Sequence, residues 1–248
     1  MLIRLATLLL AMLMSVAPAS ADSSSPLLAT YYDRQMAIVG QVAYGWQDTD
    51  RPRRIYDDAV QVGVSRTNYY VLRTGGALLK FNDASPKSRR VADSVARFAA
   101  GPTGVLAILK TCALWWFARD GGKRKIADAV ATAAVGDSAN YYVSETGALF
   151  VKGLAHRGQY GDGRLTTTDD FVQTATGVAA ITAHTGHAIL MTKTGDVLGT
   201  GGNIYGPVGR HGLGDKAVRW NMILSGAQAI ATGSSHSLAI LPGGILMA

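Results

Sequence analysis

The sequence predicts an all-β fold: a β-propeller built from repeats of about 36–49 residues that form a small or incomplete ring. Three observations predict it: a high glycine content, a regular spacing of glycine turns, and short apolar segments with strand-like alternation. Glycine accounts for 29 of 248 residues, about 12%, against roughly 7% in average proteins. So many glycines would interrupt long helices, but they suit a chain with frequent tight turns.

The composition is that of a folded domain with a hydrophobic core. Apolar residues make up 48% of the chain and charged residues 17%, which argues against disorder. The single cysteine, Cys112, excludes an intrachain disulfide and any metal site made of several cysteines. The formal net charge of +7 describes a basic protein that would attract acidic partners.

Turns recur at regular intervals along the chain. In the last two units a histidine stands eight residues before the turn glycine, His187 before Gly195 and His236 before Gly244. The six turn positions, spaced by 36, 36, 35, 48 and 49 residues, are Gly40, Gly76, Cys112, Gly147, Gly195 and Gly244. Cys112 therefore replaces a turn glycine. Such a period is typical of repeat architectures.

Each repeat is expected to contain several short antiparallel strands. Alternating apolar residues, for example Val60, Val62 and Val64, favour strands over helices. Glycines at the turns supply the positive φ that tight hairpins require. Units of this length with several strands predict a β-propeller or a related array.

The N-terminus has the features of a signal peptide. Basic Arg4 precedes an apolar run, Leu5–Val16, and small residues follow at Ala19 and Ala21. Twelve apolar residues rise only about 18 Å as a helix, too short for a hydrocarbon core of about 30 Å. We predict export to the periplasm or medium, cleavage after Ala21, and no transmembrane segment in the mature chain. The alternative is a buried N-terminal helix.

Two segments carry a resemblance to a known family. Residues 158–161 read Gly-Gln-Tyr-Gly, and Gly233 stands three residues before His236. With these motifs the chain resembles the regulator-of-chromosome-condensation repeat family, as a divergent, short and exported relative. The resemblance covers residues 55–248 and is strongest from 129 onward. It implies a propeller that binds proteins, and seven blades in the family's usual form.

The resemblance leaves two arrangements open, because this chain has fewer and shorter units than the family. After the signal peptide (residues 1–21), residues 22–54 form an N-terminal segment that would complete a blade, and residues 55–248 form the propeller repeats. In one arrangement the segment completes the last blade of a smaller ring. In the other, the arc does not close and exposes strand edges.

Basic residues gather at equivalent positions of the first three units. Each cluster lies eleven to fourteen residues after a turn position and precedes an aspartate: Asp57, Asp93 or Asp128. The nine cations are Arg51, Arg53, Arg54, Lys87, Arg89, Arg90, Lys123, Arg124 and Lys125. We expect three loops on neighbouring blades that form one basic arc. The alternative is a set of solvated loops that serve solubility.

The basic arc defines the candidate partners. By long-range attraction it would bind an acidic protein face, an anionic envelope polymer or lipid headgroups. Nucleic acid is the weakest option, because export separates the chain from chromosomes and stacking aromatics are not interleaved with the clusters.

No motif for catalysis or for a cofactor stands out. His187 and His236 are expected to pack inside their blades, and Cys112 is expected to be an inert thiol. Residues 158–163 do not form a phosphate loop, because the lysine and serine or threonine of that motif are missing. We predict a non-enzymatic protein-interaction scaffold without cofactor or metal. The alternatives are an anion-binding envelope protein and a hydrolase that would need a carboxylate opposite Asp57, Asp93 or Asp128.

Overall fold

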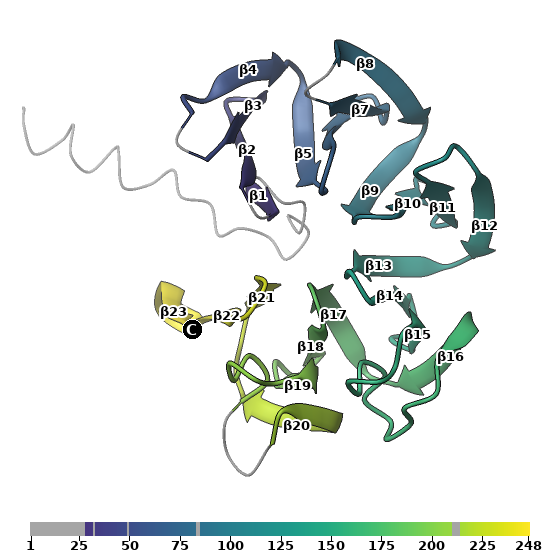
Figure 1. Cartoon of the computed structure of the whole chain (residues 1–248), viewed down its shortest axis with the longest axis vertical. Coiled ribbons are helices and arrows are strands. Elements are labelled where there is room, and N and C mark those ends of the chain that lie inside the picture. The colour runs from purple at the N-terminus through teal and green to yellow at the C-terminus, as the bar shows by residue number, and fades with distance from the viewer. Residues whose placement is uncertain (1–27, 32, 49, 83–84, 210–213) are drawn as a thin grey trace, which may run out of the picture.

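The computed structural model describes residues 28–31, 33–48, 50–82, 85–209 and 214–248. Residues 1–21, the predicted signal peptide, lie outside this part of the chain. The fold is a β-propeller of six antiparallel sheets arranged around a common centre (Figure 1). The prediction of an all-β propeller is confirmed. The one helical element in the described residues is a single 3-10 turn, η1 (Pro242–Gly244).

The first three blades have four strands each. Blade 1 contains β1 (Leu28–Tyr31), β2 (Arg34–Val39), β3 (Val42–Gln47) and β4 (Arg53–Tyr56). Blade 2 contains β5 (Ala59–Val64), β6 (Tyr69–Arg73), β7 (Leu78–Asn82) and β8 (Ser85–Ala92). Blade 3 contains β9 (Val95–Ala100), β10 (Gly104–Leu109), β11 (Leu114–Ala118) and β12 (Lys123–Ala127).

Blades 4 and 5 also have four strands, and blade 6 has three. Blade 4 contains β13 (Val130–Val135), β14 (Ala139–Ser144), β15 (Leu149–Gly153) and β16 (Thr168–Ala175). Blade 5 contains β17 (Val178–Ala183), β18 (His187–Thr192), β19 (Val197–Gly202) and β20 (Lys216–Leu224). Blade 6 contains β21 (Ala229–Thr232), β22 (Ser237–Leu241) and β23 (Ile245–Met247).

Strands follow one another in sequence order within every blade. The first strand lies at the centre of the ring and the fourth at its periphery (Figure 1). Because successive strands are antiparallel, the connections after the first and third strands lie at one end of each blade. We call this end of the propeller the loop face. It carries the two longest connections, residues 154–167 of blade 4 and, in blade 5, the connection between β19 and β20, described at residues 203–209 and 214–215.

The turn between the second and third strands links each blade to the next. Backbone carbonyls of five turn residues accept hydrogen bonds of 2.8–3.0 Å from the start of the following blade; these residues are Gln41, Gly76, Cys112, Gly147 and Gly195. All five have positive φ, including Cys112 at 61°. The predicted turn position of the first unit, Gly40, is therefore off by one residue. Gln41, with φ 65°, is the equivalent residue, since Gly40 and Gln41 together form that turn.

Apolar cores lie between successive blades rather than within them. Five buried clusters join blade 1 to 2, 2 to 3, 3 to 4, 4 to 5 and 5 to 6. In the described residues none of the five contains side chains of both the first and the last blade. Strand pairing does not join these two blades either, so hydrogen bonds between strands do not close the ring.

Strands β1–β4 form a four-stranded sheet of their own. None of its described strands pairs with β21–β23. Most of the N-terminal segment, residues 22–54, thus contributes to a blade of its own. No helix within the described ranges is long and apolar enough to cross a membrane.

Candidate functional site

The long connection of blade 5 is held in shape by one buried amide. Asn203 donates from Nδ2 to the backbone oxygens of Gly209 (2.9 Å) and Gly214 (3.3 Å), and its Oδ1 accepts from the Val208 amide at 3.2 Å. Its own backbone amide donates to Asp215 O at 2.7 Å. The two ends of the connection are therefore fixed to each other, and the residues that follow Asn203 are displayed on a rigid base.

The long connection of blade 4 packs against blade 5 through the Gly-Gln-Tyr-Gly segment. A Cβ on Gly158 would lie 2.4 Å from Ala217 O, so only glycine allows this approach. The Gly158 carbonyl accepts a hydrogen bond of 2.7 Å from the buried hydroxyl of Thr200, which also lies 3.0 Å from Ala217 O. Tyr160 is fully buried in the core between the two blades. The motif thus fixes the connection of blade 4 against strands β19 and β20 of blade 5.

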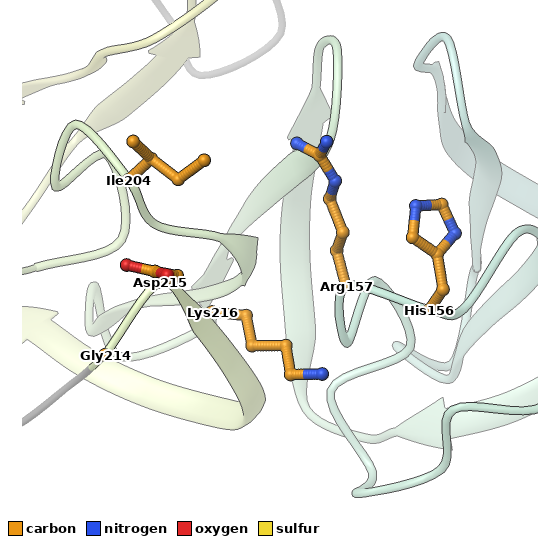
Figure 2. A pocket seen from close by; sticks show the side chains of 6 residues that line it. All are labelled: His156, Arg157, Ile204, Gly214, Asp215 and Lys216. Atoms are coloured by element: carbon orange, nitrogen blue, oxygen red, sulfur yellow. The ribbon is translucent and has the colours of Figure 1, made fainter.

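A pocket of about 570 Å³ opens between these two connections. Figure 2 shows Ile204 and Asp215 on one side and Arg157 and His156 on the other; Gly214 and Lys216 complete the lining. The lining combines an aliphatic side chain, charges of both signs and an imidazole.

Large apolar side chains are exposed on the two connections that form this pocket. Ile204 is 63% exposed and its neighbour Tyr205 70% exposed. Leu154 and Leu165, in the connection of blade 4, are also exposed. Exposed apolar side chains gathered on rigid loops are typical of binding surfaces. We call Leu154, Arg157, Ile204 and Tyr205 with the pocket lining the apolar surface.

The predicted basic residues lie on strands, not in loops. Arg53 and Arg54 lie on β4, Lys87, Arg89 and Arg90 on β8, and Lys123, Arg124 and Lys125 on β12; Arg51 precedes β4. These are the outermost strands of blades 1, 2 and 3 (Figure 1). The expectation of equivalent positions is met, but the expectation of loops is wrong. A strand at the rim is solvated on much of its surface, so it lacks the apolar alternation by which strands are recognised.

The aspartate after each cluster neutralises one of its cations. Arg54 pairs with Asp57 at 2.5 Å, Arg90 with Asp93 at 3.1 Å and Lys125 with Asp128 at 2.7 Å. Arg53 pairs with Asp50 at 3.4 Å. All these pairs are exposed. The three carboxylates considered for hydrolysis thus each have a cation partner three residues away.

Two of the predicted cations, Lys87 and Arg89, line a second cavity, between blades 2 and 3. Lys80 and Arg119 lie in the same cavity and were not predicted. Neither belongs to a run of charges, so the sequence offers no signal for them beyond their being basic.

Histidines and one tyrosine meet at the centre of the loop face. The Tyr31 hydroxyl donates to Asp137 Oδ1 at 3.0 Å, and its ring stacks on His184 with centroids 5.5 Å apart. His187 is buried as predicted, with Nε2 3.3 Å from the Ser237 hydroxyl of blade 6. Burial lowers the pKa of His187 to about 4. His236, at the equivalent position of blade 6, is exposed, contrary to prediction, since within the described residues blade 6 shares an apolar cluster only with blade 5.

Cys112 is a free thiol on a turn. A hydrogen bond to the Glu145 carboxylate is the main cause that raises the pKa of this thiol. A raised pKa keeps the thiol protonated at neutral pH and so disfavours nucleophilic chemistry. The described residues contain no cluster of three or more His, Cys, Asp or Glu side chains able to hold a metal ion.

Comparisons with known proteins place the fold. No protein-family model and no curated protein sequence matches the chain. Among solved structures, the chain is similar to Prp20p from Saccharomyces cerevisiae, which is described with its binding properties to Gsp1p and histones. The TM-score is 0.74, and the sequences are 15% identical over 88% of this chain and 70% of Prp20p. Yeast RCC1 (Prp20) bound to Kap60 matches with 0.73 and 15% over 88% and 68%.

Human WBSCR16 matches with a TM-score of 0.72 and 14% identity over 85% of this chain and 70% of that one. The low identities make the chain a divergent relative in structure, and it is shorter than each of these proteins. The resemblance to the regulator-of-chromosome-condensation repeat family is therefore confirmed at the level of the fold.

Proposed function

We propose that this chain is an exported, non-enzymatic scaffold that binds a partner protein on the apolar surface of blades 4 and 5. One observation carries the proposal: Ile204 and Tyr205 are exposed at 63% and 70% on a connection held rigid by Asn203. Aromatic side chains on a rigid base lose little entropy on binding and are enriched at interaction hot spots. Arg157 and Lys216 supply polar contacts at the rim of the same pocket.

Solved structures of the same fold support a binding role. Prp20p is described with its binding properties to Gsp1p and histones, and in another structure it is bound by Kap60. These partners are not carried over, because the proposed export would separate this chain from histones and other proteins that remain inside the cell. What carries over is the use of a propeller as a rigid binding surface.

The experiment compares three forms of the purified protein as bait for proteins of its own extracytoplasmic fraction. The forms are the wild type, the double variant Ile204→Ser/Tyr205→Ser, and the control variant Val39→Ser. Val39 is 66% exposed at the end of β2, away from the loop face, so the control removes an equally exposed apolar side chain. We expect one protein that the wild type and the control retain and that the double variant retains at least about tenfold less.

Equal capture by all three forms would place the binding site elsewhere. If none of the three forms retains a protein, the scaffold function is contradicted. Melting temperatures within a degree or two of one another would show that all three forms are folded.

Export is tested separately. Residues 1–21 fused to a reporter that is active only outside the cytoplasm should give activity, and the mature chain should begin at Asp22. Retention of Met1 on a cytoplasmic protein would contradict export without affecting the binding test.

A second candidate function, anion binding at the cell envelope, rests on the outer strands β4, β8 and β12. Five of the nine cations have no ion pair within the described residues: Arg51, Lys87, Arg89, Lys123 and Arg124. Glutamine at these five positions should lower the salt concentration that elutes the protein from an anionic polysaccharide matrix. Unchanged, salt-insensitive retention would contradict this function.

A further inference from the structure

A cavity of about 240 Å³ lies between blades 2 and 3 on the loop face, apart from the apolar surface of blades 4 and 5. Four of its lining residues are cationic: Lys80 on β7, Lys87 and Arg89 on β8, and Arg119 between β11 and β12. Thr67, Asn68 and Asn82 add neutral polar groups, and Phe81 closes the lining. None of the described lining residues is acidic.

Two of the cations lie side by side, and their like charges repel each other. Lys80 of β7 is directly opposite Arg89 of β8 in the antiparallel register. Residues directly opposite each other project from the same face of the sheet, and like charges in such a pair are destabilising. No ion pair joins any of the four cations to a carboxylate within the described residues.

Lys80 has no charged equivalent in the other four-stranded blades. The register places Lys80 on the third strand between Tyr70 and Arg89. The third-strand residues paired in the same way with the second and fourth strands are Gly45, Trp116, Val151 and Gly199. A charge at this place in the repeat is thus specific to blade 2.

Blades 4 and 5 fill the corresponding space with their long connections. Tyr160 packs into the core that contains Val151, and a Cβ on Gly199 would lie 2.7 Å from Val208 Cβ. In blade 2 the described residues around Lys80 instead line a cavity, and four of them are cations.

We propose that this cavity binds a tetrahedral oxoanion with two negative charges, phosphate or sulfate, either free or as the terminal group of a larger molecule. Arg89 and Arg119 present planar forks that match two oxygens of such a group, and Lys80 and Lys87 add point charges. A bound dianion would also remove the repulsion between Lys80 and Arg89. The volume exceeds that of several waters, at about 30 Å³ each, and so admits the anion.

The test measures binding of inorganic phosphate and of inorganic sulfate by titration calorimetry at constant ionic strength, with acetate as the monoanionic comparison. The variants are Lys80→Gln and Arg119→Gln. The matched control is Arg124→Gln, because Arg124 pairs with Trp116 in blade 3 as Arg89 pairs with Lys80 in blade 2. We expect phosphate or sulfate to bind the wild type and the control alike, acetate to bind at least about tenfold more weakly, and each test variant to lose at least about tenfold in affinity.

A thermal-melting measurement separates a binding role from a structural one. Without added anion, Lys80→Gln should melt at or above the temperature of the wild type, because the like-charge pair is removed. With saturating anion, the wild type should melt at a higher temperature and the variant should not respond.

Three results would overturn the proposal. The first is no binding of either dianion by the wild type. The second is an equal loss of affinity in Arg124→Gln, which would describe a diffuse basic surface. The third is a lower melting temperature of Lys80→Gln without anion, which would describe a structural lysine. None of them bears on capture of a partner by Ile204 and Tyr205, so the two proposals fail independently.

Discussion

At the scale of single residues, Cys112 shows what the turn geometry demands. Its φ is 61°, at a position where three other blades have glycine. In this conformation the Cβ of an L-residue raises the free energy of the folded state by roughly 1–2 kcal/mol, and glycine has no such penalty. We expect Cys112→Gly to raise the free energy of unfolding by about 0.5–1 kcal/mol, after the extra entropy that glycine loses on folding. Chemical denaturation of both proteins measures it.

The reciprocal change at an equivalent turn is the control. In Gly76→Ala a Cβ would lie 3.2 Å from Val95 O, and φ is 90°. This variant should lose about 1 kcal/mol or more. A destabilised Cys112→Gly would show that the thiol, through its hydrogen bond to Glu145, contributes more than the backbone strain costs.

His187 makes stability depend on pH. Burial lowers its pKa to about 4 in the folded state, below the usual value of about 6.5. Between these two values the unfolded chain binds more protons than the folded one, so stability falls as the pH falls. The full loss below pH 4 is about 3 kcal/mol for this group. His184, whose pKa burial also lowers, acts in the same direction.

The measurement is urea unfolding at several pH values from 4 to 8. His187→Asn should flatten the fall in stability between pH 6.5 and 4, whatever its effect at pH 8. His156→Asn, at an exposed site, should leave the slope as in the wild type. An unchanged slope in His187→Asn would assign the pH dependence to other groups.

At the scale of elements, the ion pairs of the outer strands β4, β8 and β12 contribute little to the free energy of unfolding. The pairs Arg54–Asp57, Arg90–Asp93 and Lys125–Asp128 are exposed, and exposed pairs contribute roughly 0–1 kcal/mol. The triple variant Asp57→Asn/Asp93→Asn/Asp128→Asn should therefore unfold at nearly the same denaturant concentration as the wild type. It should elute from an anionic matrix at higher salt, because three cations lose their partners. A large loss of stability would instead make these pairs structural anchors.

Blades 4 and 5 are joined by a buried hydroxyl. The Thr200 hydroxyl donates to the Gly158 carbonyl at 2.7 Å and lies 3.0 Å from the Ala217 carbonyl, and valine at this place would remove that donor. We expect Thr200→Val to lower the free energy of unfolding by about 1–3 kcal/mol, measured by denaturant unfolding. Thr194→Val, on an exposed turn, should change it by less than about 0.5 kcal/mol. Equal effects would mean that Thr200 does not couple the blades.

These elements also show which features follow from sequence. Periodic features do: turn positions such as Gly76 and Gly147 and the three basic clusters recur at fixed intervals, and each repeat supports the others. Features that occur once in the chain cannot be predicted in this way. Lys80 and Arg119, for example, line one cavity only when blade 2 packs on blade 3. The exposure of His236 depends on what lies beyond its blade, which local pattern does not encode.

The same limit applies to the candidate sites. The apolar surface forms only when residues 154–157 of blade 4 and residues 204–205 and 214–216 of blade 5, about fifty positions later, are brought together by folding. The motif in residues 158–161 indicates only that its backbone packs closely against blade 5. The sequence predicts which residues form the basic clusters. That these residues lie on strands and not in loops is seen only from the strand pairing.

At the scale of the whole molecule, blades 1 and 6 have fewer apolar contacts with other blades than blades 2 to 5 have, within the described residues. Each of blades 2 to 5 shares an apolar cluster with both neighbours, whereas blades 1 and 6 share one each. Blade 1 gains a contact across the centre, where Tyr31 meets Asp137 of blade 4 and His184 of blade 5. Stability should therefore be graded around the ring.

Hydrogen exchange measured by mass spectrometry tests this gradient, because segments with fewer buried contacts open at lower free energy. We expect the fastest exchange in β21–β23, where Ile245 and Leu246 are exposed, intermediate exchange in β1–β4, and the slowest in β13–β19. Tyr31→Ala should speed exchange in β1 and β2 more than in β9–β12, since Tyr31 belongs to blade 1, packs in the cluster between blades 1 and 2, and meets Asp137 and His184 across the centre. Equal protection of blades 1, 4 and 6 would mean that the ring opens as one cooperative unit, and the contact across the centre would then carry no separate share of its stability.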